Sequence, residues 1–353
     1  MFRLVPFFLM RLRYHGLKNA GLCLATALLI LAPTARAFAQ QTADFKGPLL
    51  TSNGYPLLLP FLSLRPERAQ PLAPGKLQLT LSTTYGNVSH QDPNFLYPDL
   101  LVFMDMEVVR INMGLDVGLP GDLTLGANLS SVEEFGGFFD PVIQAFHGLF
   151  HLPNGDRARY PNDQYVFRLI RNGTAMVDLQ DPGFGLGDLY LTGKWTVFSS
   201  PSTGWWLALQ AAVKFPTGST ERFLSNGGLD GSFGLLFSFV TGPFALYGRL
   251  NYLYLSEPQT PRIFTFTSHT MGFFAALEWM QTPELSWLVQ LEAATSPFQD
   301  PQPWIGLPSG QVNAGFRSRV PGIGLFQASF AEEFPSFAQL DVALNLAYTY
   351  ELR

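Results

Sequence analysis

The chain has 353 residues, 14% of them charged and 14% aromatic, and a formal net charge of −5. The charged fraction is far below the roughly 25% that is usual in soluble domains. The acidic balance argues against a nucleic-acid partner, because phosphate binding needs a basic face.

The first 39 residues have the three parts of a secretory signal. A basic head without acidic residues is followed by an apolar stretch from Gly21 to Ala32, and small-x-small sites end at Ala37 and Ala39. The apolar stretch is too short to span a bilayer as a helix, which needs about 20 residues. We therefore expect export and cleavage after Ala39, with Ala37 as the second choice.

The only cysteine, Cys23, lies inside this signal, so the mature chain has no disulfide and no cysteine-based site. Leu22 precedes it and the apolar run continues beyond it, which argues against a lipoprotein anchor. Cleavage after Ala39 removes five basic residues and no acidic ones. It leaves 17 basic against 27 acidic residues, a net charge of −10.

Residues 40–75 are rich in proline and leucine and show little alternation. Prolines at positions 56, 60, 66, 71 and 74 rule out a central strand. The segment is expected to be either a periplasmic lead-in or a plug inside a barrel. The plug is favoured, because a free tail would expose its leucines to water.

From residue 76 onward, polar and apolar residues alternate in long segments, which indicates strands with two different faces. Within 188–198, for example, Leu189, Leu191 and Trp195 alternate with polar residues. These segments are longer than the ~5–6 residues of strands in soluble sheets and long enough to cross a bilayer. The mature chain has no apolar run of a length that would form a transmembrane helix.

The connections alternate in length, with short ones at 119–122, 199–204, 241–243, 281–283 and 321–322. Between them lie longer ones at 89–100, 133–185, 218–228, 257–263, 298–309 and 333–337. Short periplasmic turns and longer outer loops are typical of outer-membrane barrels. The sequence therefore predicts an all-β fold, an antiparallel transmembrane β-barrel over 76–353 with both ends periplasmic. Its twelve strands are expected at 76–88, 101–118, 122–132, 186–198, 205–217, 229–240, 244–256, 264–280, 284–296, 310–320, 323–332 and 338–352.

Two details follow from this strand assignment. The side chains expected to point outward near the periplasmic ends are Trp195, Trp205, Trp279, Trp287 and Tyr350, with Tyr85, Tyr252 and Tyr254 near the opposite ends, as in aromatic girdles. In the second strand the apolar face changes parity near Val108 and Val109, which predicts a β-bulge there.

The long extracellular loop 133–185 contains a predicted amphipathic helix over 140–152. Asp140 is its expected N-cap and Pro141 its first helical position, and apolar residues recur at helical spacing. The helix needs an apolar surface, either the barrel mouth or the outer leaflet. Beyond it, residues 165–170 and 174–179 are expected to pair as a hairpin.

The run from Gly136 to Asp140, continued by Phe146–Arg157, resembles an uncharacterised family of bacterial outer-membrane proteins that is known as a domain of unknown function. The later stretch Gly185–Leu191 fits the same family. The resemblance covers nearly the whole mature chain, and it implies an outer-membrane barrel without implying an activity. The chain ends on Leu352 and Arg353 instead of the usual aromatic residue that the barrel assembly machinery reads. We interpret this ending as a variant signal.

Three groups of side chains are candidates for sites of chemistry. His147 and His151 have a metal-ligand spacing, but no third ligand accompanies them. Ser225 and His269 correspond to the serine and histidine of barrel phospholipases, yet Phe223 stands where that pattern needs a histidine. Calcium-type oxygen ligands are offered by Asn154, Asp156, Asn162 and Asp163, in a spacing that matches no calcium loop. The sequence therefore predicts no enzyme, no cofactor and no metal site.

The residues expected to line the lumen carry both charge signs. They are Arg110, Asp116, Asp188, Lys194, Lys214, Arg249, Glu278, Glu292, Arg317, Arg319, Asp341 and Glu351. Such charges either pair across a narrow lumen and close it or line a polar path. The favoured hypothesis is a narrow channel or transporter for a small solute in the outer membrane, with lipid and the assembly machinery as partners. The alternatives are a structural or surface-interaction barrel that works through its long loop, and a lipid-modifying enzyme.

Overall fold

The computed structural model describes residues 45–92, 100–151, 160–258, 265–299, 306–333 and 340–352. The predicted signal peptide and its cleavage site lie outside these residues. The described residues divide into two compact units, one within 45–138 and 163–352 and the other within 139–162. Among the described residues, no helix combines the length and apolar character needed to span a bilayer.

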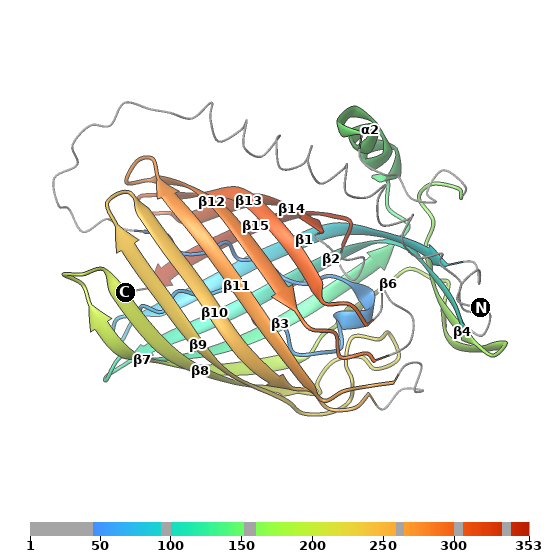
Figure 1. The fold of residues 1–353 in the computed structure, drawn as a ribbon, viewed down its shortest axis with the longest axis horizontal. Helices are drawn as coiled ribbons and strands as arrows, with labels where there is room; N and C mark the ends of the chain where they lie inside the picture. The colour runs from blue at the N-terminus through green and yellow to red at the C-terminus, as the bar shows by residue number, and fades with distance from the viewer. Residues whose placement is uncertain are drawn as a thin grey trace, which may run out of the picture. The chain divides into compact units, whose positions relative to one another are not determined.

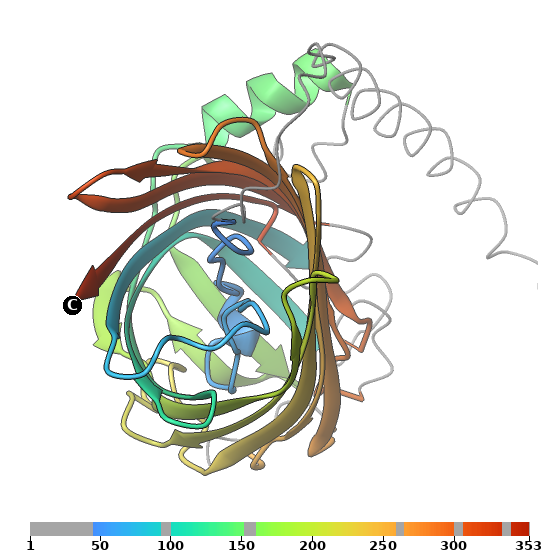
Figure 2. The ribbon, with the colours of Figure 1, turned by 90° about the vertical axis from the view of Figure 1, so that its left-hand side faces the viewer.

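The larger unit is a closed antiparallel barrel of twelve strands (Figures 1 and 2). Each strand pairs with the next along the chain, and the last pairs with the first, with Leu77 opposite Leu352. Closure leaves no free sheet edge. All twelve predicted strands are confirmed. They are β1 (Leu77–Asp92), β2 (Leu100–Leu119), β3 (Leu123–Phe135), β7 (Leu189–Ser200), β8 (Trp205–Phe215), β9 (Asp230–Thr241), β10 (Phe244–Tyr254), β11 (His269–Met280), β12 (Leu285–Ala294), β13 (Ser309–Val320), β14 (Gly324–Glu333) and β15 (Val342–Leu352).

The two faces of the wall differ as the alternation predicts. Along β15, Leu344 and Leu346 are exposed on the outside, whereas Asn345 and Thr349 are buried inside. This apolar-out, polar-in order is typical of a barrel in lipid. Of the predicted aromatic residues, those exposed outside are Trp195, Trp205, Trp287, Tyr350, Tyr252 and Tyr254, while Trp279 and Tyr85 are half-buried.

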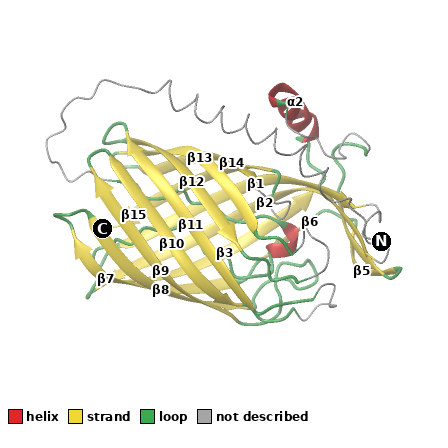
Figure 3. Ribbon diagram, in the orientation of Figure 1, coloured by secondary structure: helices red, strands yellow, loops and turns green. Residues whose placement is uncertain are grey.

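Three short strands extend the wall at the loop end (Figure 3). The predicted hairpin is confirmed as β4 (Val166–Arg171) and β5 (Thr174–Leu179), and β4 also pairs with β2. Its turn, Asn172-Gly173, has positive φ at both residues, which is the geometry that this dipeptide favours. The strand β6 (Gly183–Leu186) continues the pairing along β3.

The predicted bulge at Val108 and Val109 is wrong. The register of β2 runs without a shift against both β1 and β3, and its even-numbered residues point inward throughout. Near the loop end these inward residues are apolar, and they include Met104, Met106 and Val108. The apolar pattern changes because the lumen changes from polar to apolar, not because the strand does. A register shift does occur in β7, between Thr196 and Phe198.

The smaller unit contains the predicted helix, α2 (Asp140–Phe150). Asp140 is its first helical residue and not its cap, which is Phe139 without a side-chain hydrogen bond. The carboxylate still lies in the first turn, where it complements the helix dipole. The helix ends at His151, which is left-handed and whose N–H bonds back to the carbonyl of His147.

Residues 45–75, here called the lumen segment, run through the barrel (Figure 2). Their only regular element is the short 3-10 helix η1 (Pro56–Leu58). Toward the loop end the segment packs its apolar side chains into the main core of the protein. That core includes Tyr55, Leu57, Phe61 and Leu62 of the segment and Val102, Met104, Met106, Phe167 and Leu169 of the strands around it. The hydrophobic core of this barrel therefore lies inside its bore.

Candidate functional site

The wall holds the lumen segment through its backbone N–H groups. Glu278, which is fully buried, accepts from the N–H of Lys46 at 2.9 Å and of Gly47 at 3.0 Å. Gln290 accepts from the N–H of Leu49 at 3.0 Å, and Gln327 accepts from that of Leu50 at 2.8 Å. These contacts satisfy donors that a segment without a strand partner would otherwise leave unbonded.

The cations of the wall bind the carbonyls of the same segment. Arg249 donates to the carbonyls of Leu64 and Arg65, at 2.9 and 2.8 Å. Lys194 donates to the carbonyl of Arg68 at 2.9 Å, and Arg110 to that of Asn53 at 2.6 Å. Prolines favour this arrangement, because they resist pairing in a sheet and leave carbonyls available as acceptors.

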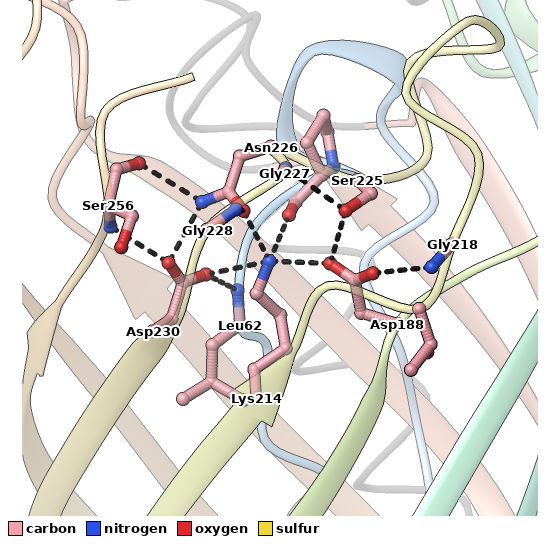
Figure 4. A network of polar contacts seen from close by, with 12 residues as sticks. Leu62, Asp188, Lys214, Gly218, Ser225, Asn226, Gly227, Gly228, Asp230 and Ser256 are labelled. Atoms are coloured by element: carbon pink, nitrogen blue, oxygen red, sulfur yellow. Dashed lines mark hydrogen bonds and ion pairs between the residues drawn. The ribbon is translucent and has the colours of Figure 1, made fainter. Parts of the chain in front are cut away.

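The densest contacts surround Lys214 of β8 (Figure 4). Its ammonium group lies 2.5 Å from a carboxylate oxygen of Asp188 and 3.2 Å from one of Asp230. It also donates to the side-chain oxygen of Asn226 at 2.6 Å and to the carbonyl of Pro60 at 2.9 Å. All four side chains are at least nine-tenths buried. Such a buried charge is tolerated only when partners compensate for its lost hydration.

The two carboxylates extend this network to the surrounding backbone. Asp188 accepts from the N–H of Gly218 at 2.8 Å and from the Ser225 hydroxyl at 3.0 Å. Asp230 accepts from the N–H of Leu62 at 2.9 Å and of Ser256 at 2.8 Å. One lysine thus ties the lumen segment and the loop before β9 to the wall.

A cavity of about 640 Å³, here called the turn-end cavity, lies where the strands meet their short turns. The lumen segment forms one side of it, and the turn between β13 and β14 forms another. Deeper in the lumen, a cavity of about 20 Å³ remains between the segment and β1–β3. That space holds about one water molecule, so the segment fills the bore there closely.

The structure places the predicted lumen residues in different surroundings. Those bonded to the lumen segment are Arg110, Asp116, Lys194, Lys214, Arg249, Glu278, Glu292 and Arg317, and Asp188 joins them through Lys214. Arg319 and Glu351 line the turn-end cavity. Asp341 is half-buried before β15, where its N–H bonds the Asn87 carbonyl.

The prediction missed the neutral side chains that bind the segment. Gln290, Gln327 and Ser238 all contact its backbone. All three lie at buried, inward positions of their strands. The period-2 alternation of each strand indicates these positions, whether the side chain is charged or neutral.

The candidate hydrolase pair is not brought together. Ser225 is 1% exposed and donates to Asp188 inside the barrel. His269 is exposed on the outer face, where its ring contacts Tyr252 and Tyr254. An attacking serine needs its base within hydrogen-bond reach, and the barrel wall separates these two side chains.

The candidate metal ligands do not form a cluster in the part of the chain that the structure describes. No three His, Cys, Asp or Glu side chains gather there to hold an ion. Asn154 and Asp156 lie outside the described residues, and Asn162 accepts a hydrogen bond from Gln144 at 2.9 Å. His151 is the C-cap residue of α2.

A closed barrel with an apolar outer face, long strands and a polar interior defines a transmembrane β-barrel of the outer-membrane type. The chain belongs to the DUF3187 family, described as a protein of unknown function, whose family model matches residues 25–352.

Among solved structures, the chain is similar to the COG4313 outer membrane channel from Pseudomonas putida F1, with 13% identity and a TM-score of 0.55. The match covers 82% of this chain and all of that one. The NanC porin matches at 6% identity and a TM-score of 0.43, over 77% of this chain and 97% of that one. At these identities the likeness concerns the fold. No curated protein matches the chain.

Proposed function

We propose that the protein is an outer-membrane channel for a small solute, and that the lumen segment closes it. The observation that carries this proposal is the choice of hydrogen-bond acceptors by the cations inside the barrel. Arg249, Arg317 and Lys194 donate to carbonyls of the segment. A wall built only for rigidity would direct such cations to carboxylates of neighbouring strands.

The way the lumen segment is held supports a removable closure. Among the described residues, its one backbone hydrogen bond to a barrel strand is from the N–H of Gly75 to the carbonyl of Gly118 at 2.9 Å. Its other contacts with the wall are hydrogen bonds and ion pairs of side chains, and apolar packing near η1. If the segment left, the same inward charges would line a polar path, as in channels. Twelve strands enclose a bore between the filled interior of eight and the aqueous channel of sixteen.

The positions of the polar side chains in the barrel wall favour a role in transport over a role in lipid modification. Ser225 is buried in the lumen and His269 lies on the outer face, so the pair offers no interfacial active site. The apolar core around Phe61 and Met104 fills the loop end of the bore. We therefore place the main barrier to solutes at that end.

A reversible tether tests whether the segment is the closure. The hydroxyl oxygens of Ser52 in the segment and Thr84 in β1 lie 2.8 Å apart. Because the mature chain has no cysteine, a Ser52→Cys/Thr84→Cys variant offers a single disulfide across these positions. In planar bilayers, the oxidised variant should show no openings, and a reductant should restore those of the unmodified protein.

Two further variants complete the test. Deleting residues 45–74 should give a steadily conducting barrel, whereas Ser52→Cys alone should behave like the unmodified protein with or without reductant. Assembly is checked by the shift in gel mobility that folded barrels show on heating. A folded deletion variant that neither conducts nor admits solutes into liposomes would refute the proposal.

A further inference from the structure

The turn-end cavity concentrates positive charge in an acidic protein. Its lining includes seven lysine or arginine side chains and three acidic ones, although the mature chain has 17 basic against 27 acidic residues. Ile323 and Glu351 on its rim are exposed, so solvent reaches the cavity from the short-turn end. In an outer-membrane barrel that end faces the periplasm.

Two of the three acidic side chains are already paired. Asp116 forms an ion pair with Arg65. Glu67 lies 3.3 Å from the ammonium group of Lys194 and 3.4 Å from Arg65. These pairs leave the cavity with a surplus of positive charge.

Arg68 and Arg317 are two of the five basic side chains that remain on the lining. Within the described ranges, neither has a carboxylate within ion-pair distance. Each bonds only to backbone carbonyls: Arg68 to Phe45 at 3.0 Å, and Arg317 to Lys46 at 2.6 Å and Pro48 at 2.9 Å. All of these bonds use one terminal nitrogen, Nη1, of each guanidinium group.

Both arginine side chains lie close to Gly47. A Cβ atom at Gly47 would lie 3.5 Å from Nη1 of Arg317 and 3.6 Å from Cδ of Arg68. Gly47 also has φ +89°, which disfavours a side chain there. Glycine at this position therefore keeps a side chain out of the space beside the guanidinium group of Arg317 and the side-chain stem of Arg68.

Among the described residues, the buried polar atoms of this lining that have no hydrogen-bond partner include one of Arg317 and one of Thr349. Arg317 is 4% exposed and its Nε has no acceptor, and Thr349 is 6% exposed and its hydroxyl has none. Buried donors in native proteins are normally bonded. An anion in the cavity would accept from these groups and balance the surplus charge.

We propose that the turn-end cavity binds a small anion through a carboxylate or phosphate group held between Arg68 and Arg317. The planar guanidinium group matches such oxyanions with paired donors. The inference stands apart from the channel proposal, because it concerns binding from the periplasmic side and requires no conduction.

Calorimetry on the full mature protein in detergent, with chloride as the background anion, tests the site. Inorganic phosphate and succinate are titrated separately, which distinguishes the two oxyanion classes. We expect at least one to bind at a single site. Arg317→Gln and Arg68→Gln should each weaken that binding at least tenfold, and the double variant should abolish it.

The matched control is Arg168→Gln, which removes the same charge from the β4–β5 hairpin outside the cavity. It should leave the affinity unchanged. The proposal is overturned if the unmodified protein binds neither anion, or if Arg168→Gln weakens binding as much as the cavity variants. If Arg317→Gln does not fold, Arg68→Gln decides the question, since that side chain belongs to the lumen segment and has a single carbonyl bond.

Discussion

Replacing Lys214 with methionine should strongly destabilise the barrel. The change keeps a long side chain but removes the charge shared by Asp188 and Asp230, at 2.5 and 3.2 Å. Both carboxylates are buried, at 8% and 1% exposure. Removing one partner of a buried ion pair costs about 3–5 kcal/mol, because the remaining charge is left uncompensated. With a slope of about 1–3 kcal/mol per molar urea, the unfolding midpoint should fall by on the order of 2 M.

The measurement is urea unfolding in lipid vesicles, followed by tryptophan fluorescence. Arg168→Met is the control, since the Arg168–Asp178 pair is 3.0 Å long but more than a third exposed. Exposed pairs contribute at most about 1 kcal/mol. Adding Asp188→Asn and Asp230→Asn to Lys214→Met should recover most of the lost stability. A Lys214→Met loss no larger than that of Arg168→Met would refute the reasoning.

Three further predictions concern the lumen segment, the lipid face and the hairpin. Gly118→Ala should loosen the end of the lumen segment, because a Cβ there would lie 2.1 Å from the Ala73 carbonyl oxygen; limited proteolysis should cut near residue 73 faster than in the unmodified protein. Leu346→Arg, at an outward position that is 61% exposed, should lower the unfolding free energy by about 2–4 kcal/mol if it lies near the bilayer midplane, whereas Leu346→Ile should change it little. Gly173→Val, at φ +76°, should disorder the β4–β5 turn at a cost of about 1–2 kcal/mol, seen as faster amide exchange there while the barrel strands stay protected.

The lumen segment is part of both the proposed closure and the proposed anion site. It supplies Arg68 to the turn-end cavity, and the carbonyl of Phe45 accepts from that side chain. The carbonyls of Lys46 and Pro48 accept from Arg317, and Gly47 lies beside it. An anion bound there would contact both the closing segment and the wall. If the segment moves when the channel opens, binding and opening are linked, since each changes the equilibrium of the other.

Much of the barrel could be predicted from local patterns. The period-2 alternation identifies each strand because a barrel strand has one face in lipid and one in the lumen. The same parity assigned Lys214, Glu278 and Arg249 to the interior before any partner was known. The short turns and the hairpin at Asn172-Gly173 could also be predicted from local sequence, because each depends on only a few residues.

Local sequence patterns were therefore enough to predict the strands, their two faces and the inward charges. The groups that those charges bind became apparent only in the folded molecule, because the lumen segment has no periodic pattern. Its partners lie between 32 and 277 residues away along the chain. The mistaken bulge near Val108 has the same origin. Whether an inward position is polar or apolar depends on what fills the bore at that depth, and no local pattern in β2 records that Tyr55, Leu57 and Phe61 lie there.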